Sequence, residues 1–124
     1  MKHHEDDEQR ALFQWAGYRK DLKWMHAIPN GGNRNRNEAA RMIGQGTKKG
    51  VFDVFLPLPV YRPGVNGFHA GLYIEMKRRK DQGSSRISPE QVEFAADMTD
   101  VGYKCVVCYG FEEARQAIKD YTGK

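Results

Sequence analysis

The amino-acid sequence predicts an α/β protein in which a mixed central β-sheet is flanked by helices. Short runs rich in β-branched and aromatic residues lie at 51–56, 72–77 and 103–109. Segments with apolar residues at helical spacing lie at 5–20, 37–44, 88–100 and 111–121. Glycine and proline separate most of these segments. This alternation of strands and helices is typical of helices packed on a sheet.

In the first half of the chain, we expect an amphipathic helix over 5–20 and a shorter helix over 37–44. The apolar stretch 24–28 ends at Pro29-Asn30-Gly31-Gly32, which is typical of a short strand followed by a turn. The first strong strand, 51–56, follows.

In the second half, the segment 57–67 is rich in proline and glycine and is expected to be a loop. The helix at 88–100 has a well-defined start. Ser88 is its expected N-cap, followed by Pro89 at the first helical position and Gln91 as the capping-box partner. With the last strand and helix, the predicted order is α-β-(α)-β-β-α-β-α.

The composition indicates a globular domain with a polyanionic partner. The 124 residues are expected to form one stand-alone domain, 1–124, with a net charge of +4. No apolar run is long enough for a membrane helix, and the polar start argues against a secretory signal, so we expect no membrane contact. The expected location is the cytoplasm of a bacterial cell or of a phage-infected host.

Cys105 and Cys108 form a C-x-x-C pattern, which can indicate zinc or redox chemistry. They lie within a predicted strand, where residues three apart point to opposite faces. A zinc site also needs further ligands, and the sequence has no second pair. We therefore predict two free structural cysteines.

One carboxylate in each of two predicted strands forms a candidate catalytic group. Glu75 and Lys77 project from the face opposite the apolar residues of their strand. Asp53 lies in an apolar run, where an unpaired carboxylate is costly. If the two strands pair as a hairpin, Asp53 and Glu75 lie across from each other. The alternative is a cross-strand salt bridge between Asp53 and Lys77, with Glu75 solvated.

Two adjacent carboxylates repel each other, and a hard divalent cation relieves the repulsion. Magnesium prefers oxygen ligands and retains water or substrate phosphate oxygens. A neighbouring lysine can orient or deprotonate the attacking water and offset charge on the phosphate. This combination suits phosphodiester hydrolysis.

The chain resembles the VRR-NUC branch of the PD-(D/E)XK nuclease superfamily. The resembling stretches are HAIPNGG at 26–32, GTKKGVFD at 46–53, GLYIEMK at 71–77, SPEQ at 88–91 and GY at 102–103. They cover nearly the whole chain in the family's order. Phe52 departs from the pattern, because the superfamily has a structural proline there. The resemblance implies a restriction-endonuclease-like αβββαβ core and a DNA endonuclease dependent on Mg²⁺ or Mn²⁺.

The resemblance also implies residue roles. Asp53 and Glu75 bind the metal, and the backbone carbonyl of Met76 completes its inner shell. Lys77 is the catalytic lysine. Gln91 joins the active site from the following helix, although its capping role alone would also explain its presence.

The family further uses a glutamate of the first helix in catalysis and metal binding. We favour Glu8 over Glu5, because Glu8 shares the inward face with Leu12 and Trp15. The basic residues are candidates for DNA phosphate contacts, although solvated charged faces would give the same pattern. The candidates are Arg34, Arg36, Lys48, Lys49, Arg78, Arg79 and Lys80.

The implied substrate is branched DNA, such as four-way Holliday junctions or flaps, and the implied assembly is a homodimer. An apolar loop could supply interface surface, or could fold back on its own core. Its residues are Leu58, Val60, Tyr61, Val65 and Phe68. The alternatives are a nuclease acting on simple linear DNA and a non-catalytic DNA-binding module of the same fold.

Overall fold

A computed structural model of the protein describes residues 4–29, 35–64 and 67–124. The elements are α1 (His4–Ala16), a 3₁₀ turn (Lys20–Leu22), β1 (His26–Ala27), α2 (Arg36–Gly44), β2 (Val54–Leu56), β3 (Val60–Arg62), β4 (Gly67–His69), β5 (Leu72–Lys77), a second 3₁₀ turn (Lys80–Gln82), α3 (Pro89–Asp100), β6 (Lys104–Tyr109) and α4 (Phe111–Thr122). The predicted α/β class is confirmed.

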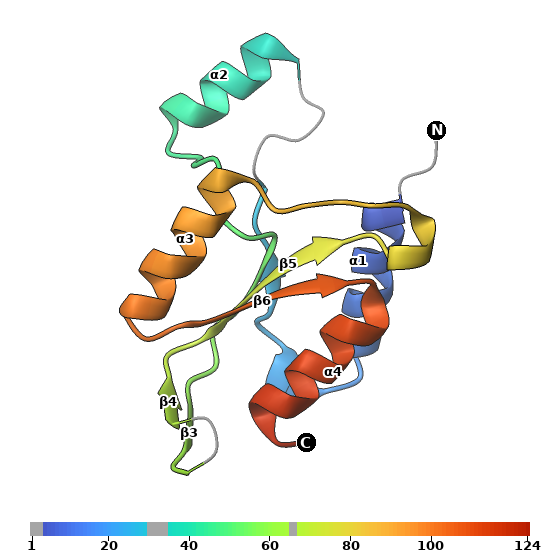
Figure 1. The fold of residues 1–124 in the computed structure, drawn as a ribbon, viewed down its shortest axis with the longest axis vertical. Helices are drawn as coiled ribbons and strands as arrows, with labels where there is room; N and C mark the ends of the chain where they lie inside the picture. The colour runs from blue at the N-terminus through green and yellow to red at the C-terminus, as the bar shows by residue number, and fades with distance from the viewer. Residues whose placement is uncertain (1–3, 30–34, 65–66) are drawn as a thin grey trace.

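The main sheet has four strands in the order β1-β2-β5-β6. β1 pairs with β2 and β2 with β5 in antiparallel fashion, whereas β5 and β6 are parallel. In Figure 1, α3 covers one side of this sheet, and α1 and α4 cover the other. The elements α1, β1, β2, β5, α3 and β6 form the predicted αβββαβ core.

The core lies mainly between the sheet and the pair α1 and α4. Leu72, Ile74 and Met76 of β5 are buried on this side with Leu12 of α1 and Ile118 of α4. The intervening side chains of β5 point toward α3, as the period of two predicts. The same strand therefore supplies an apolar face to the core and a polar face to the opposite side.

Two predicted boundaries were wrong by several residues. α1 ends at Ala16 rather than at residue 20, because the chain turns at Gly17, whose N–H still reaches the carbonyl of Phe13. The strand expected from residue 51 begins at Val54. Asp53 lies just before this strand. Its side-chain carboxylate, in place of a backbone carbonyl, accepts the hydrogen bond from the N–H of Met76.

The expected loop at 57–67 contains a two-stranded antiparallel sheet, β3 and β4, that the sequence did not predict. Leu58 and Val60 pack against the core, whereas Tyr61 and Phe68 are 72% and 59% exposed. The segment therefore folds back on the core in part, and its two aromatic side chains remain exposed. Val65 lies outside the described residues.

α2 lies apart from the sheet, beyond the start of α3 (Figure 1), and none of its residues is buried. Its N-cap is Asn35, whose side chain accepts a hydrogen bond from the N–H of Glu38. Within residues 4–29, 35–64 and 67–124, no helix has the length and apolar character needed to cross a membrane.

The two cysteines are free, as predicted, and only Cys108 is fully buried. Burial raises the pKa of the Cys108 thiol to about 12. Such a thiol is protonated at neutral pH and is a poor nucleophile or metal ligand. The C-x-x-C pattern is therefore structural in this fold.

Candidate active site

The pairing of β2 with β5 brings the two candidate carboxylates together. Val54 is opposite Ile74 in the antiparallel register. The next positions outward on the two chains are Asp53 and Glu75. Asp53 is tied to β5, because its Oδ2 accepts a hydrogen bond of 3.0 Å from the N–H of Met76. The expected cross-strand placement is confirmed.

Glu75 is a buried carboxylate, with 3% of its surface exposed. Its Oε2 accepts a hydrogen bond of 2.7 Å from Gln91 Nε2 and lies 3.4 Å from Lys77 Nζ. Its Oε1 is buried with no hydrogen-bond partner in the described part of the chain. The alternative in which Glu75 is solvated was therefore wrong, and Lys77 pairs with this buried acid.

The environment of Glu75 raises its pKa from 4.5 to about 7. Burial is the largest cause, and the negative charge of Asp53 is the second. Lys77 and Gln91 oppose the rise, but they do not cancel it. The two carboxylates thus repel each other, which is the electrostatic condition that a bound cation would relieve.

Gln91 makes the capping-box contacts and also contacts Glu75. The side-chain Oε1 of Gln91 accepts a hydrogen bond from the backbone N–H of Ser88. The backbone N–H of Gln91 donates to Ser88 Oγ, which completes the capping box. The same side chain donates from Nε2 to Glu75. Because the cap occupies the amide oxygen, the amide nitrogen is the atom presented to the carboxylate. The start of α3 therefore fixes the orientation of the Glu75 side chain.

The backbone of β5 adds one further oxygen on the same side. The N–H of Met76 points toward Asp53, whereas the carbonyl of Lys77 accepts from the N–H of Gly110 on the β6 side. In an extended strand the N–H and C=O of one residue share a side, and successive residues alternate. The carbonyl of Met76 therefore points to the Asp53 side of β5.

These donors fit a hard divalent cation. The residues present two carboxylates, one of them with an unpartnered buried oxygen, and a backbone carbonyl nearby. No group of three or more His, Cys, Asp or Glu side chains suited to a metal occurs among the described residues. Oxygen donors that leave positions for water and phosphate suit Mg²⁺ or Mn²⁺ better than zinc, which favours closed His and Cys sites.

Glu8 is the inward-facing glutamate of α1, as expected, and Glu5 is exposed. Glu8 Oε1 accepts a hydrogen bond of 2.8 Å from the N–H of Phe111, and its Oε2 lies 3.6 Å from Arg79 Nη1. Glu8 thus contacts the start of α4 and Arg79. In this arrangement Glu8 joins α1 to α4 at the end of the sheet where the site lies.

Gly110 is a residue of this region that the sequence analysis missed. It has a φ of +95°, and a Cβ here would lie 2.5 Å from Arg79 Cγ and 3.1 Å from Glu8 Oε1. Only glycine permits this close approach of the chain. The available signal was a lone glycine between a strand and a helix, which is also common at ordinary turns.

The predicted DNA contacts fall into two groups. Five candidates are exposed, whereas Arg78 is half-buried. The exposed ones are Arg36, Lys48, Lys49, Arg79 and Lys80. Lys49 Nζ lies 3.4 Å from Glu90 Oε1, next to Gln91 at the start of α3. Gly50 contacts the same turn, since a Cβ there would lie 2.6 Å from the carbonyl oxygen of Glu90. Lys49 and Gly50 therefore lie beside the start of α3, the helix whose Gln91 contacts Glu75. Arg34 lies outside the described residues.

The two arginines that follow β5 also have internal partners. Arg78 Nη2 donates to the carbonyl of Ser84 over 2.8 Å. Arg79 pairs with Asp81 at 3.1 Å as well as with Glu8. Both arginines fix the segment that follows β5, and these ion pairs would compete with contacts to phosphate.

The raised pKa of Glu75 predicts how stability depends on pH. Between pH 4.5 and about 7, the native protein retains a proton that the unfolded chain has lost. The stability of the metal-free protein is thus expected to fall as the pH rises through this window, by up to about 3 kcal/mol. Glu75→Gln should remove most of this fall. Urea unfolding in chelator at pH 5 and pH 8 tests it, and an unchanged pH dependence in the variant would contradict it.

Comparisons with known proteins agree with this geometry. No protein-family model matches the chain, and no curated protein is a significant match. A solved structure described as "VRR_NUC domain protein" is similar, with a TM-score of 0.74 and 26% sequence identity. The similarity covers 99% of this chain and 91% of that one. The fold expected from the sequence is therefore confirmed over nearly the whole length.

Proposed function

By its fold the chain belongs to the VRR-NUC domain family, and we propose that it is a DNA endonuclease dependent on Mg²⁺ or Mn²⁺. The observation that supports this most is the buried Glu75, with the half-buried Asp53 across from it and Lys77 beside it. The negative charge of Asp53 raises the pKa of Glu75, and a bound cation would relieve this repulsion.

In this proposal each residue has a separate task. Asp53 and Glu75 hold the ion, with the carbonyl of Met76 as a further donor. A bound divalent ion lowers the pKa of water and stabilises charge on the phosphate. Gln91 keeps the Glu75 carboxylate in position. Lys77 has its ammonium beside Glu75, where it orients the attacking water and offsets negative charge on the phosphate.

We further propose that the enzyme acts on branched DNA as a homodimer. The exposed cations near α2 are held beside the catalytic helix and suit phosphate contacts. Gripping a junction requires contacts on more than one arm, and a two-fold dimer doubles both the basic surface and the catalytic site. The exposed Tyr61 and Phe68 of the hairpin are candidates for the interface.

The decisive experiment measures cleavage of end-labelled four-way junction, flap and linear duplex with Mg²⁺, with Mn²⁺ or with excess chelator. We expect cutting only with metal and a preference for the branched forms, from a protein that is dimeric by light scattering. Cleavage in chelator would refute the metal mechanism. Equal rates on linear and branched DNA would indicate a general nuclease, and binding without cleavage would indicate a DNA-binding module.

A further inference from the structure

A hollow of about 520 Å³ opens at the C-terminal end of α1, away from the catalytic residues. The hollow adjoins Met25, the residue that precedes β1. The active site lies beyond the other end of β1, where the N–H of Ile28 donates to the carbonyl of Asp53. The two sites therefore lie at opposite ends of the sheet. Its volume is in the range of sites that bind small organic groups.

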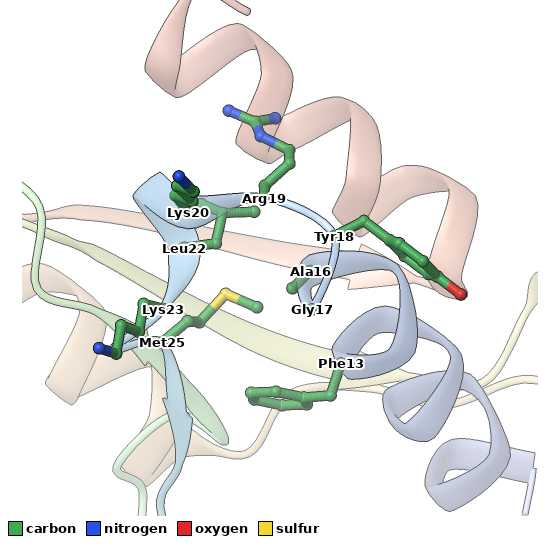
Figure 2. Close-up of a pocket in the computed structure, with 9 residues that line it drawn as sticks. All are labelled: Phe13, Ala16, Gly17, Tyr18, Arg19, Lys20, Leu22, Lys23 and Met25. Carbon is green, nitrogen blue, oxygen red and sulfur yellow. The ribbon is translucent and has the colours of Figure 1, made fainter.

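The interior of the hollow is apolar and its rim is basic. Ala16, Leu22 and Met25 are buried at its base. In Figure 2, Phe13 and Met25 extend toward the same space from α1 and from the segment before β1. Lys20 and Lys23 lie on one side of this space, and Tyr18 on the other.

The charge around the hollow favours an anionic occupant. Three cations line it and no acid does. Arg19 is neutralised by Asp21, whose Oδ2 lies 2.7 Å from Arg19 Nη2. Lys20 and Lys23 are exposed, which leaves two positive charges for a ligand.

Exposed aromatic rings border the same region. Tyr18 is 91% exposed and Trp24 is 73% exposed. Lys23 Nζ lies 5.4 Å from the centre of the Trp24 ring. Two large aromatic rings are thus available to a ligand beside the hollow. Aromatic faces interleaved with lysines are the usual chemistry for binding single-stranded nucleic acid, in which bases stack and phosphates pair with cations.

We propose that this hollow is a second nucleic-acid site, which binds an unpaired segment of the substrate. A base enters beside Phe13, neighbouring bases stack on Tyr18 and Trp24, and Lys20 and Lys23 contact the phosphates. The inference rests on the proposed nuclease function, because flaps and junction intermediates carry unpaired nucleotides. It places recognition of that strand at a distance from the bond that is cut.

The test measures binding of a fluorescent oligothymidylate in chelator by anisotropy. Lys20→Glu with Lys23→Glu, and separately Tyr18→Ala, should weaken binding by about tenfold. Tyr18→Phe keeps the ring and should bind like the original protein. The matched control Lys104→Glu with Lys119→Glu makes the same charge change at exposed positions elsewhere, and should weaken binding by less than about twofold.

The outcomes also separate this inference from the proposed function. Cleavage of linear duplex with Mg²⁺ should be the same in Tyr18→Ala as in the original protein. Loss of oligonucleotide binding only in the rim variants supports the inference even if the protein cuts no DNA. Equal losses in the rim and control charge variants would overturn it. So would an oligoglutamate peptide that binds as tightly as the oligonucleotide, because the hollow would then be a peptide site.

Discussion

Replacing Lys77 with methionine is expected to lower the rate of DNA cleavage by at least about 100-fold while leaving DNA affinity nearly unchanged. Lys77 is buried and its ammonium lies 3.4 Å from Glu75. Methionine keeps most of the aliphatic stem and removes the charge. Among the many cations of the chain, Lys77 is the one beside the proposed metal ligands, so its loss should scarcely change the total attraction for phosphate.

The matched control is Lys80→Met, an exposed lysine three residues further along the chain. Single-turnover cleavage and DNA binding at several salt concentrations should be measured for both variants, with circular dichroism to verify folding. We expect Lys80→Met to retain cleavage and to reduce the salt dependence of binding slightly. A Lys77→Met protein that cuts at the original rate would make Lys77 a structural cation and remove it from the mechanism.

The elements that carry the catalytic candidates were predictable because their signals are local. β5 lies within its predicted bounds, since alternation along six residues fixes which side chains share a face. α3 begins where Ser88, Pro89 and Gln91 indicate, because a capping box is defined within four residues. The meeting of Asp53 and Glu75 needed only the added assumption that β2 and β5 pair as antiparallel strands.

The features that sequence analysis missed depend on contacts distant in the chain. The partner of Glu8 is the N–H of Phe111, about a hundred residues away, and no local pattern indicates that pair. Arg79 resembles any exposed cation in the sequence until folding brings Glu8 beside it. The β3–β4 hairpin was also missed, because its strands are three residues long and lie among prolines and glycines.

The repulsion between Asp53 and Glu75 connects the proposed function with the stability of the protein. Glu75 accepts a hydrogen bond from Gln91 and forms an ion pair with Lys77. Its pKa is nevertheless raised to about 7, because it is buried and lies near Asp53. We therefore expect the metal-free protein to gain stability at pH 8 when a neutral group replaces either acid. A bound cation would convert this repulsion into attraction and stabilise the native state through its binding free energy.

Asp53→Asn tests this connection, because it should weaken metal binding and stabilise the metal-free protein at the same time. An asparagine oxygen can still accept the hydrogen bond from the N–H of Met76. The variant removes the charge, which is the second largest cause of the raised pKa of Glu75. We expect Mn²⁺ affinity to fall by at least about tenfold, and the metal-free free energy of unfolding at pH 8 to rise by about 1 kcal/mol.

Asp100→Asn is the matched control, since Asp100 is an exposed carboxylate at the end of α3. Calorimetric titration with Mn²⁺ gives the affinity, and urea unfolding in chelator gives the stability. Asp100→Asn should leave both quantities unchanged within about 0.5 kcal/mol. A metal-free Asp53→Asn protein that is clearly less stable than the original would mean that Asp53 is held by a favourable ion pair. The two carboxylates would then be a structural feature of the sheet, and the case for a metal-binding pair would fail.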